Sequence, residues 1–131
     1  MINKAEPLVS IIIRTKNEEK WISACLRSVF RQNYKNIEVI LVDNESTDNT
    51  VIRAQEFPIK LVKIKDFFPG KAINDGIRAS SGKYIVCLSG HCIPVNSEWL
   101  TFLVRDLSNS QIAISGFCMG KVPSPIKRFG L

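Results

Sequence analysis

Three short polar segments each follow an apolar run, and their residue types could hold a charged ligand through hydrogen bonds. The first covers residues 14–18 and contains Thr15, Asn17 and Glu18 after the run LVSIII. Polar groups at a strand end and a helix N-terminus can hold the base and ribose of a nucleotide. The same residues also suit a capped helix start with a solvated loop. This segment alone leaves both interpretations open.

The second polar segment is VDNESTDNT, residues 42–50. Asp43 ends an apolar run, and Asn44 follows it directly. A carboxylate or amide oxygen at this place can accept the N3 hydrogen of uracil or thymine. The alternative is turn chemistry followed by a helix cap, because Asp, Asn and Ser all favour such turns.

The third polar segment is SGHCIP, residues 89–94, which holds His91, the only histidine. A histidine directly after a buried strand can ligate a metal or contact a phosphate, or it can be a hydrogen-bonded structural residue. Residues 70–86 contain neither GxGxxG after a strand nor the phosphate-binding GxxxxGK[ST]. Lys71, near a predicted helix start, could contact a diphosphate or be solvated.

The elements that must position these segments alternate between strand and helix patterns. Apolar runs predict strands over residues 8–13, 37–42, 59–64 and 84–88, with a fifth over 112–114. Caps and helical spacing predict helices from Asn17 to Phe30, from Thr47 or Asp48 to Glu56, over 71–79, and from Pro94 or Asn96 to Leu107. This order is typical of a mainly parallel sheet, whose ligands bind at the carboxyl ends of the strands.

Composition narrows the class of protein. A chain of 131 residues, 45% hydrophobic and 23% charged, predicts one globular domain. A net charge of +6 suits an anionic partner: a nucleotide phosphate, a nucleic acid or an acidic membrane surface. The aromatic residues are not interleaved with basic ones, which argues against nucleic acid. The uncharged runs 84–97 and 107–120 are too short to span a membrane, and residues 1–7 lack a signal-peptide core, so we expect a cytoplasmic protein.

The four cysteines are Cys25, Cys87, Cys92 and Cys118, and no two form a CxxC pair. Their apolar neighbours and low density predict reduced, buried thiols rather than a disulfide framework. The alternative is a zinc site that combines these cysteines with His91, although the spacings differ from those of structural zinc motifs.

In order and spacing, the segments resemble the inverting family 2 glycosyltransferases. The resemblance rests on VSIIIRTKNE, EVILVDNESTDNT, KAINDGIRASSGKYIVCL and NSEWL, and it covers residues 9–103. It implies an α/β fold of the GT-A type, a Rossmann-like three-layer sandwich around a mainly parallel sheet. It also implies sugar transfer from a nucleotide-diphosphate donor to an acceptor, in bacterial cell-surface polysaccharide synthesis, in the cytoplasm and at the inner face of the membrane.

The resemblance assigns roles by position. Thr15, Asn17 and Glu18 stand where the family holds the nucleoside. Asp43 and Asn44 stand where it usually has two acidic residues, one of which contacts the base, and the Asn44 side-chain oxygen can still accept a hydrogen bond. Asn74 and Gly76 match the helix before the fourth strand, and Lys71 and Asn74 complete the expected donor site.

The largest departure lies at the family's DXD motif, whose second acidic residue binds manganese or magnesium. The aligned residues here are Ser89, Gly90 and His91, so both carboxylates are missing. Imidazole suits manganese or softer metals better than magnesium. His91 would therefore ligate a divalent metal, replace it as a cation at the diphosphate, or mark a weakened site.

The second departure is length. The family's acceptor half follows the metal motif and carries the catalytic aspartate, whereas residues 116–131 contain no Asp or Glu. We therefore expect residues 1–131 to be a single donor-binding half, truncated or naturally short, with no catalytic base identified. The alternative is a non-catalytic interaction module with the same fold. Apolar residues 112–119, left uncovered by a missing half, would favour a homo-oligomer.

Overall fold

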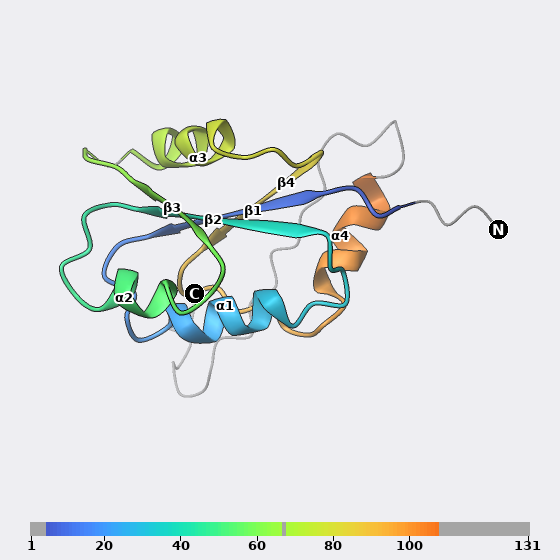
Figure 1. The fold of residues 1–131 in the computed structure, drawn as a ribbon, viewed down its shortest axis with the longest axis horizontal. Helices are drawn as coiled ribbons and strands as arrows, with labels where there is room; N and C mark the ends of the chain where they lie inside the picture. Colours follow the sequence, from blue (N-terminus) through green and yellow to red (C-terminus); the bar gives the residue numbers. More distant parts are fainter. Residues whose placement is uncertain (1–4, 67, 108–131) are drawn as a thin grey trace, which may run out of the picture.

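The computed structural model describes residues 5–66 and 68–107, which form a four-stranded parallel sheet with helices on both faces (Figure 1). The strand order is β3-β2-β1-β4. Along the chain the elements are β1 (Val9–Thr15), α1 (Ile22–Phe30), β2 (Ile37–Asp43), α2 (Thr50–Ala54), β3 (Lys60–Lys63), α3 (Pro69–Arg78), β4 (Tyr84–Ser89) and α4 (Trp99–Leu107). The predicted α/β fold with a parallel sheet is confirmed.

The central strand β1 explains why the sheet holds together. Its residues Ile11, Ile12 and Ile13 are at most 1% exposed, because β2 and β4 flank the strand and helices cover both of its faces. The register pairs Thr15 with Asp43 and Arg14 with Ser89. Polar residues that the sequence analysis placed after the strands therefore form the last residues of the strands.

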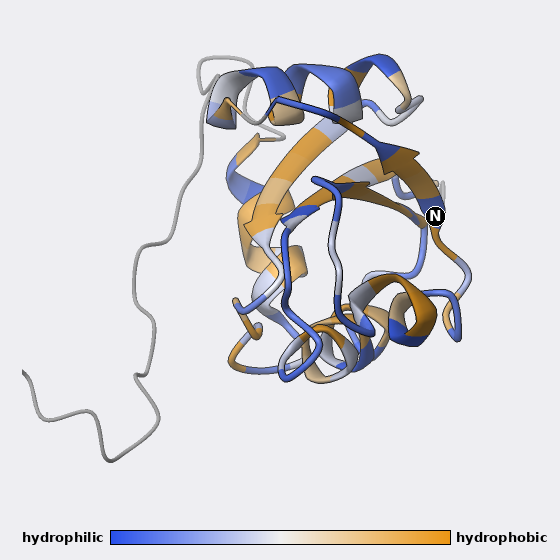
Figure 2. Ribbon diagram, turned by 90° about the vertical axis from the view of Figure 1, so that its left-hand side faces the viewer, coloured by the Kyte–Doolittle hydropathy of each residue, from blue (hydrophilic) through white to orange (hydrophobic). Residues whose placement is uncertain are grey.

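The helices make two unequal layers, and the side chains of β1 alternate between them. Val9, Ile11 and Ile13 pack with buried residues of α1, α2 and α4 in one cluster, whereas Ile12 packs with Ala72 of α3 in the other. Figure 1 shows α3 alone above the sheet, and Figure 2 shows the hydrophobic strands between α3 and the opposite layer. This is the predicted three-layer sandwich.

Gly76 permits the close approach of α3 to the sheet. A Cβ at this position would lie 2.4 Å from Ile12 Cγ2 and 3.0 Å from Val42 Cγ2. Both contacts belong to stiff, β-branched side chains in the core, so they have little freedom to move away.

All four helix starts differ from the prediction, that of α3 by two residues, since it begins at Pro69. α1 begins at Ile22 and not after Asn17, whose backbone is left-handed with a φ of 52°. α4 begins at Trp99, because the Pro94 and Asn96 carbonyls accept hydrogen bonds from Ser28 of α1 and from Gln32, two residues after α1. α2 spans Thr50–Ala54 only. Asp48 does satisfy its start, since Asp48 Oδ1 accepts from the Thr50 backbone N–H at 2.9 Å.

The prediction that the cysteines are buried is wrong for two of them. Cys25 is buried, whereas Cys87 and Cys92 are exposed, and all three are free thiols. Cys87 lies on β4 and pairs in register with Ile12, but α3 lies mainly over β1 and β2 and leaves it uncovered. Cys92 follows β4 in a loop. Cys118, the predicted fifth strand and the apolar residues 112–119 lie outside the described residues.

None of the helices within the described ranges combines the length and the apolar character that crossing a membrane requires.

Candidate functional site

Asp43 is the centre of a hydrogen-bonded group at the carboxyl ends of β1 and β2. Its carboxylate accepts from the Thr15 hydroxyl at 3.2 Å and from the Ser46 backbone N–H at 3.0 Å. The Ser46 hydroxyl also donates to it, at 2.5 Å. Asp43 is 2% exposed and Thr15 5%. A buried carboxylate therefore lies at the edge of the sheet. Thr15 of the neighbouring strand β1 and Ser46 of the loop after β2 hold it in position.

The loops after β1 and β2 are joined by several hydrogen bonds between residues about 30 positions apart. Asn17 Oδ1 accepts from the Thr47 backbone N–H at 2.8 Å, and the Asn17 backbone N–H donates to the Ser46 hydroxyl at 2.9 Å. The Glu18 backbone N–H donates to the Thr50 hydroxyl at 2.7 Å. The prediction that Asn17 caps a helix is wrong, because its amide is used to hold the neighbouring loop.

Glu19 and Asp48 continue this pairing. The Glu19 backbone N–H donates to Asp48 Oδ2 at 3.1 Å, and the Asn49 backbone N–H donates to Glu19 Oε2 at 3.2 Å. Burial alone would raise the pKa of Asp48, but hydrogen bonds from Thr50 and Glu19 outweigh it and lower the pKa below its usual range. Asp48 therefore remains an ionised acceptor that stabilises the loop pair.

Two residues of these loops have left-handed backbones. Asn17 has a φ of 52° and Glu45 a φ of 50°. Asparagine tolerates this conformation, whereas it costs a glutamate free energy. Strain of this kind persists where the surrounding contacts determine the loop shape, and it clusters at functional sites.

Asn44 extends the pairing of β1 and β2 by one residue. Its backbone N–H donates to the Thr15 carbonyl at 3.0 Å, and the residue is 5% exposed. It lies beside Asp43 as the sequence order requires, and like Asp43 it is buried.

The loop after β4 reaches the same edge. The Gly90 backbone N–H donates to the Arg14 carbonyl at 3.0 Å. A Cβ on Gly90 would be 3.3 Å from both Thr15 Cβ and Glu18 Cγ, so this loop lies directly against the loop after β1. His91 Nδ1 is 2.8 Å from Glu18 Oε1, and the His91 side chain is 56% exposed.

The structure thus brings Thr15, Asn17, Glu18, Asp43 and His91 to one edge of the sheet. Glu18 connects the three loops, because its backbone bonds Thr50 and its carboxylate contacts His91. Sequence reasoning did not single out Ser46, Thr50 or Glu19. The spacing of Asp43 and Ser46, three residues apart, is a local turn signal that could have indicated Ser46.

Lys71 and Asn74 stand apart from this group. Both are exposed on α3, and Lys71 Nζ pairs with Asp75 Oδ2 at 2.9 Å, one helical turn away. Within the described ranges, no hydrogen bond or ion pair joins either side chain to the three loops.

Comparison with known proteins identifies the family. Residues 10–126 match the family model of glycosyl transferase family 2. The chain belongs to this family. A Methanococcus voltae relative, dolichyl N-acetyl-α-D-glucosaminyl phosphate 3-β-D-2,3-diacetamido-2,3-dideoxy-β-D-glucuronosyltransferase, is 36% identical over 95 residues, 66% of this chain and 30% of its own length. The chain spans 30%, 38% and 48% of the length of the first three curated relatives.

Two solved structures of glycosyltransferases have the same fold. A Pyrobaculum calidifontis mannosyltransferase, in complex with GDP-Man and Mn²⁺, matches with a TM-score of 0.75 and 23% identity over 83% of this chain and 34% of its own. Glucosyl-3-phosphoglycerate synthase from Mycobacterium tuberculosis, in complex with Mn²⁺, UDP and phosphoglyceric acid, matches with a TM-score of 0.69 and 26% identity over 79% and 40%. The predicted GT-A fold is confirmed.

The described residues of this family 2 chain do not fit a metal ion held by protein ligands. Between residues 5 and 107, residue 67 aside, no three His, Cys, Asp or Glu side chains converge to hold one. Where the family has its acidic pair, the chain offers the single imidazole of His91, with Nδ1 turned to Glu18. Magnesium prefers several oxygen ligands.

The chemistry of Cys25 argues against the alternative of a zinc site. Burial, with smaller effects from Cys92 and Glu18, raises the pKa of the Cys25 thiol to about 12. A zinc ligand must be a thiolate, so Cys25 is poorly suited to that role.

Proposed function

We propose that this chain binds the nucleotide-diphosphate part of a sugar donor at the edge formed by the loops after β1, β2 and β4. The observation that carries the proposal is the buried Asp43 carboxylate, which Thr15 and Ser46 position beside the His91–Glu18 contact. Solved neighbours in complex with UDP and GDP-Man support a nucleotide at this fold.

The base and ribose are assigned to the loops after β1 and β2. Asp43 and Asn44 supply oxygen acceptors for the N3–H of a pyrimidine base, and Thr15, Asn17 and Glu18 surround the nucleoside. The bonds between the two loops order these groups before the ligand arrives. Such preorganisation reduces the ordering cost of binding.

The diphosphate is assigned to His91. With Nδ1–H donating to Glu18, the ring in its protonated form presents Nε2–H as a donor to the diphosphate, and the side chain is exposed enough to meet it. Lys71 and Asn74 of α3 are proposed as further contacts, which requires Lys71 to leave Asp75. Because the described residues form no group of metal ligands, the proposed diphosphate contacts are made by side chains alone.

The wider reaction is an inverting transfer of the sugar to an acceptor, in the synthesis of a cell-surface polysaccharide. The homologues support a transferase, and glycan synthesis agrees with the Methanococcus relative. In this proposal residues 1–131 bind the donor in the cytoplasm.

A second candidate is a non-catalytic module with the family 2 fold. The observation that favours it is Ser89–Gly90–His91 in place of the family's acidic pair. Nucleotide binding separates the two candidates, since an interaction module needs none.

The test is thermal unfolding of the full chain with UDP, dTDP or GDP at millimolar concentration, each with Mn²⁺ and with a chelator. A ligand that binds only the folded state raises the Tm, by mass action. We expect at least one nucleotide to raise the Tm, in the chelator as well as in Mn²⁺. No shift with any of the three would overturn donor binding and leave the interaction module.

A further inference from the structure

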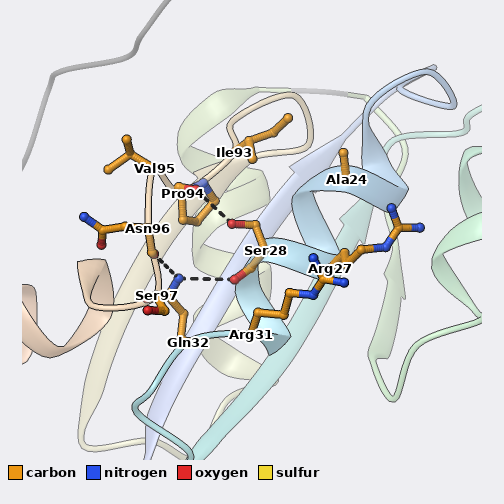
Figure 3. Close-up of a pocket in the computed structure, with 10 residues that line it drawn as sticks. All are labelled: Ala24, Arg27, Ser28, Arg31, Gln32, Ile93, Pro94, Val95, Asn96 and Ser97. Carbon is orange, nitrogen blue, oxygen red and sulfur yellow. Dashed lines mark hydrogen bonds between the residues drawn. The ribbon is translucent and has the colours of Figure 1, made fainter.

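Away from the donor edge, α1 and the loop before α4 enclose a groove of about 400 Å³ (Figure 3). Arg27, Ser28 and Arg31 line it from the helix, and Ile93, Val95 and Asn96 line it from the loop. The groove shares no lining residue with the proposed donor site, although its loop begins two residues after His91.

The loop is held firmly against the helix. The Ser28 hydroxyl donates to the Pro94 carbonyl at 2.8 Å, and Gln32 Nε2 donates to the Asn96 carbonyl at 2.6 Å. Gln32, 1% exposed, also accepts from the Leu100 backbone N–H at 3.0 Å. Figure 3 shows the first two bonds crossing from helix to loop. The groove is thus a built feature of the fold.

The side chains that line the groove carry positive charge. Arg27 lies on α1, and Arg31 lies four positions further on, directly after the last residue of the helix; both are exposed. In the described part of the chain neither guanidinium has an ion-pair or hydrogen-bond partner. Residues 20–37 contain four basic residues and no aspartate or glutamate, and the loop residues that line the groove contain no acid, the nearest in sequence being Glu98, directly after Ser97. A partner that fits this surface is anionic.

The loop adds two aliphatic side chains that the fold leaves in water. Ile93 is 45% exposed and Val95 is 56% exposed, although Pro94 between them is buried. Val95 points away from α1 in Figure 3. A dissolved phosphate would satisfy the arginines but would give these side chains nothing to pack against.

We infer that this surface, made of Arg27, Arg31, Ile93 and Val95, docks on a bilayer that contains anionic phospholipid. Such a bilayer presents phosphates to the arginines and acyl chains to the aliphatic pair. Basic residues near an anionic leaflet and shallowly inserted apolar side chains are the two contributions that hold peripheral proteins at a membrane.

The test is co-sedimentation of the full chain with vesicles of phosphatidylcholine alone or mixed with phosphatidylglycerol. We expect binding to the mixed vesicles and none to phosphatidylcholine alone. Arg27→Gln/Arg31→Gln should weaken binding by about 25-fold, since each basic residue near the surface contributes about a five-fold factor. Lys63→Gln/Lys65→Gln removes the same charge at the end of β3, the edge strand on the opposite side of the sheet from β4, and should change binding less than two-fold.

Ile93→Ser/Val95→Ser tests the aliphatic pair and should also weaken binding, whereas Ile52→Ser, which alters a 66% exposed residue on α2, should not. Thermal melts verify that each variant folds, and UDP binding of the Arg27/Arg31 and Ile93/Val95 variants, measured at about 0.5 M salt where long-range attraction is screened, should be unchanged. Equal losses from the two charge pairs would overturn the inference in favour of diffuse attraction. Full competition by soluble glycerol phosphate would overturn it in favour of a small-anion site, and equal binding to both vesicle types would overturn it as well.

Discussion

At the scale of single residues, the contact between His91 and Glu18 joins the loop after β4 to the loop after β1. If His91 meets the diphosphate, His91→Ala should lower UDP affinity about ten-fold or more, since a hydrogen bond to a charged group contributes about 1.5–3 kcal/mol. Uridine affinity should hardly change, because the nucleoside lacks the phosphates. Titration calorimetry measures both.

Cys92→Ser is the control for this experiment, since it alters the next exposed side chain of the same loop and should leave both affinities unchanged. Equal losses of UDP and uridine in the His91→Ala variant would remove His91 from the phosphate contact.

At the opposite edge of the sheet, the Glu38 carboxylate also accepts several hydrogen bonds. Burial acts to raise its pKa, but hydrogen bonds from Ser10, Ser81 and Gly82 outweigh this and lower the pKa. A lowered pKa in the folded state stabilises the fold above the unfolded pKa of about 4.3, and this contribution is lost as the pH falls through the folded value.

We therefore expect the wild type to lose stability relative to Glu38→Gln as the pH falls below about 4. Urea unfolding of both proteins across this range measures the difference. A constant difference at every pH would show that the carboxylate charge contributes nothing to stability.

At the scale of elements, α3 depends on the missing side chain of Gly76. Gly76→Ala would place a Cβ 2.4 Å from Ile12 Cγ2, and overpacking of this kind costs about 1–3 kcal/mol. Gly70→Ala is the matched control in the same helix, because nothing lies within 4 Å of its Cβ and alanine favours the helix. Chemical denaturation should show Gly76→Ala destabilised and Gly70→Ala unchanged or slightly stabilised. Equal changes in stability for the two variants would indicate that helix propensity, and not contact with the sheet, determines the effect of Gly76→Ala.

The strands could be predicted from the sequence, and the helix starts could not. β1 and β2 are rich in Val and Ile, and their burial on both faces follows from the parallel sheet. Asn17 followed by Glu18 and Glu19 resembles a helix start locally, but its amide bonds Thr47, 30 residues away. The left-handed turn at Asn17 accompanies that long-range bond, and the late start of α4 accompanies the bonds from Ser28 and Gln32 to the loop before it, so neither is visible in the local sequence.

At the scale of the whole molecule, the topology accounts for the part of the site that could be predicted. Parallel strands carry Thr15, Asp43 and the loop of His91 to one edge, as the order of strands and helices indicated. What could not be predicted is the specific partner of each group, such as Glu18 for His91, 73 residues apart. The exposure of Cys87 could not be predicted either, because it depends on which strands α3 covers.

The net charge of +6 is a property of the whole chain, and it should act on the donor before any contact forms. Because UDP is a polyanion and uridine is neutral, UDP affinity should fall as salt rises from about 0.05 M to about 0.5 M while uridine affinity stays constant. Lys35→Gln/Lys83→Gln lowers the net charge by two just before β2 and β4, at the end of the sheet opposite the donor edge, so it should flatten the salt dependence for UDP and leave uridine binding alone. Titrations of both ligands at several salt concentrations measure these slopes. A UDP affinity as insensitive to salt as that of uridine would show that long-range attraction has no part in binding, and that the phosphates are held by short-range contacts such as the one proposed for His91.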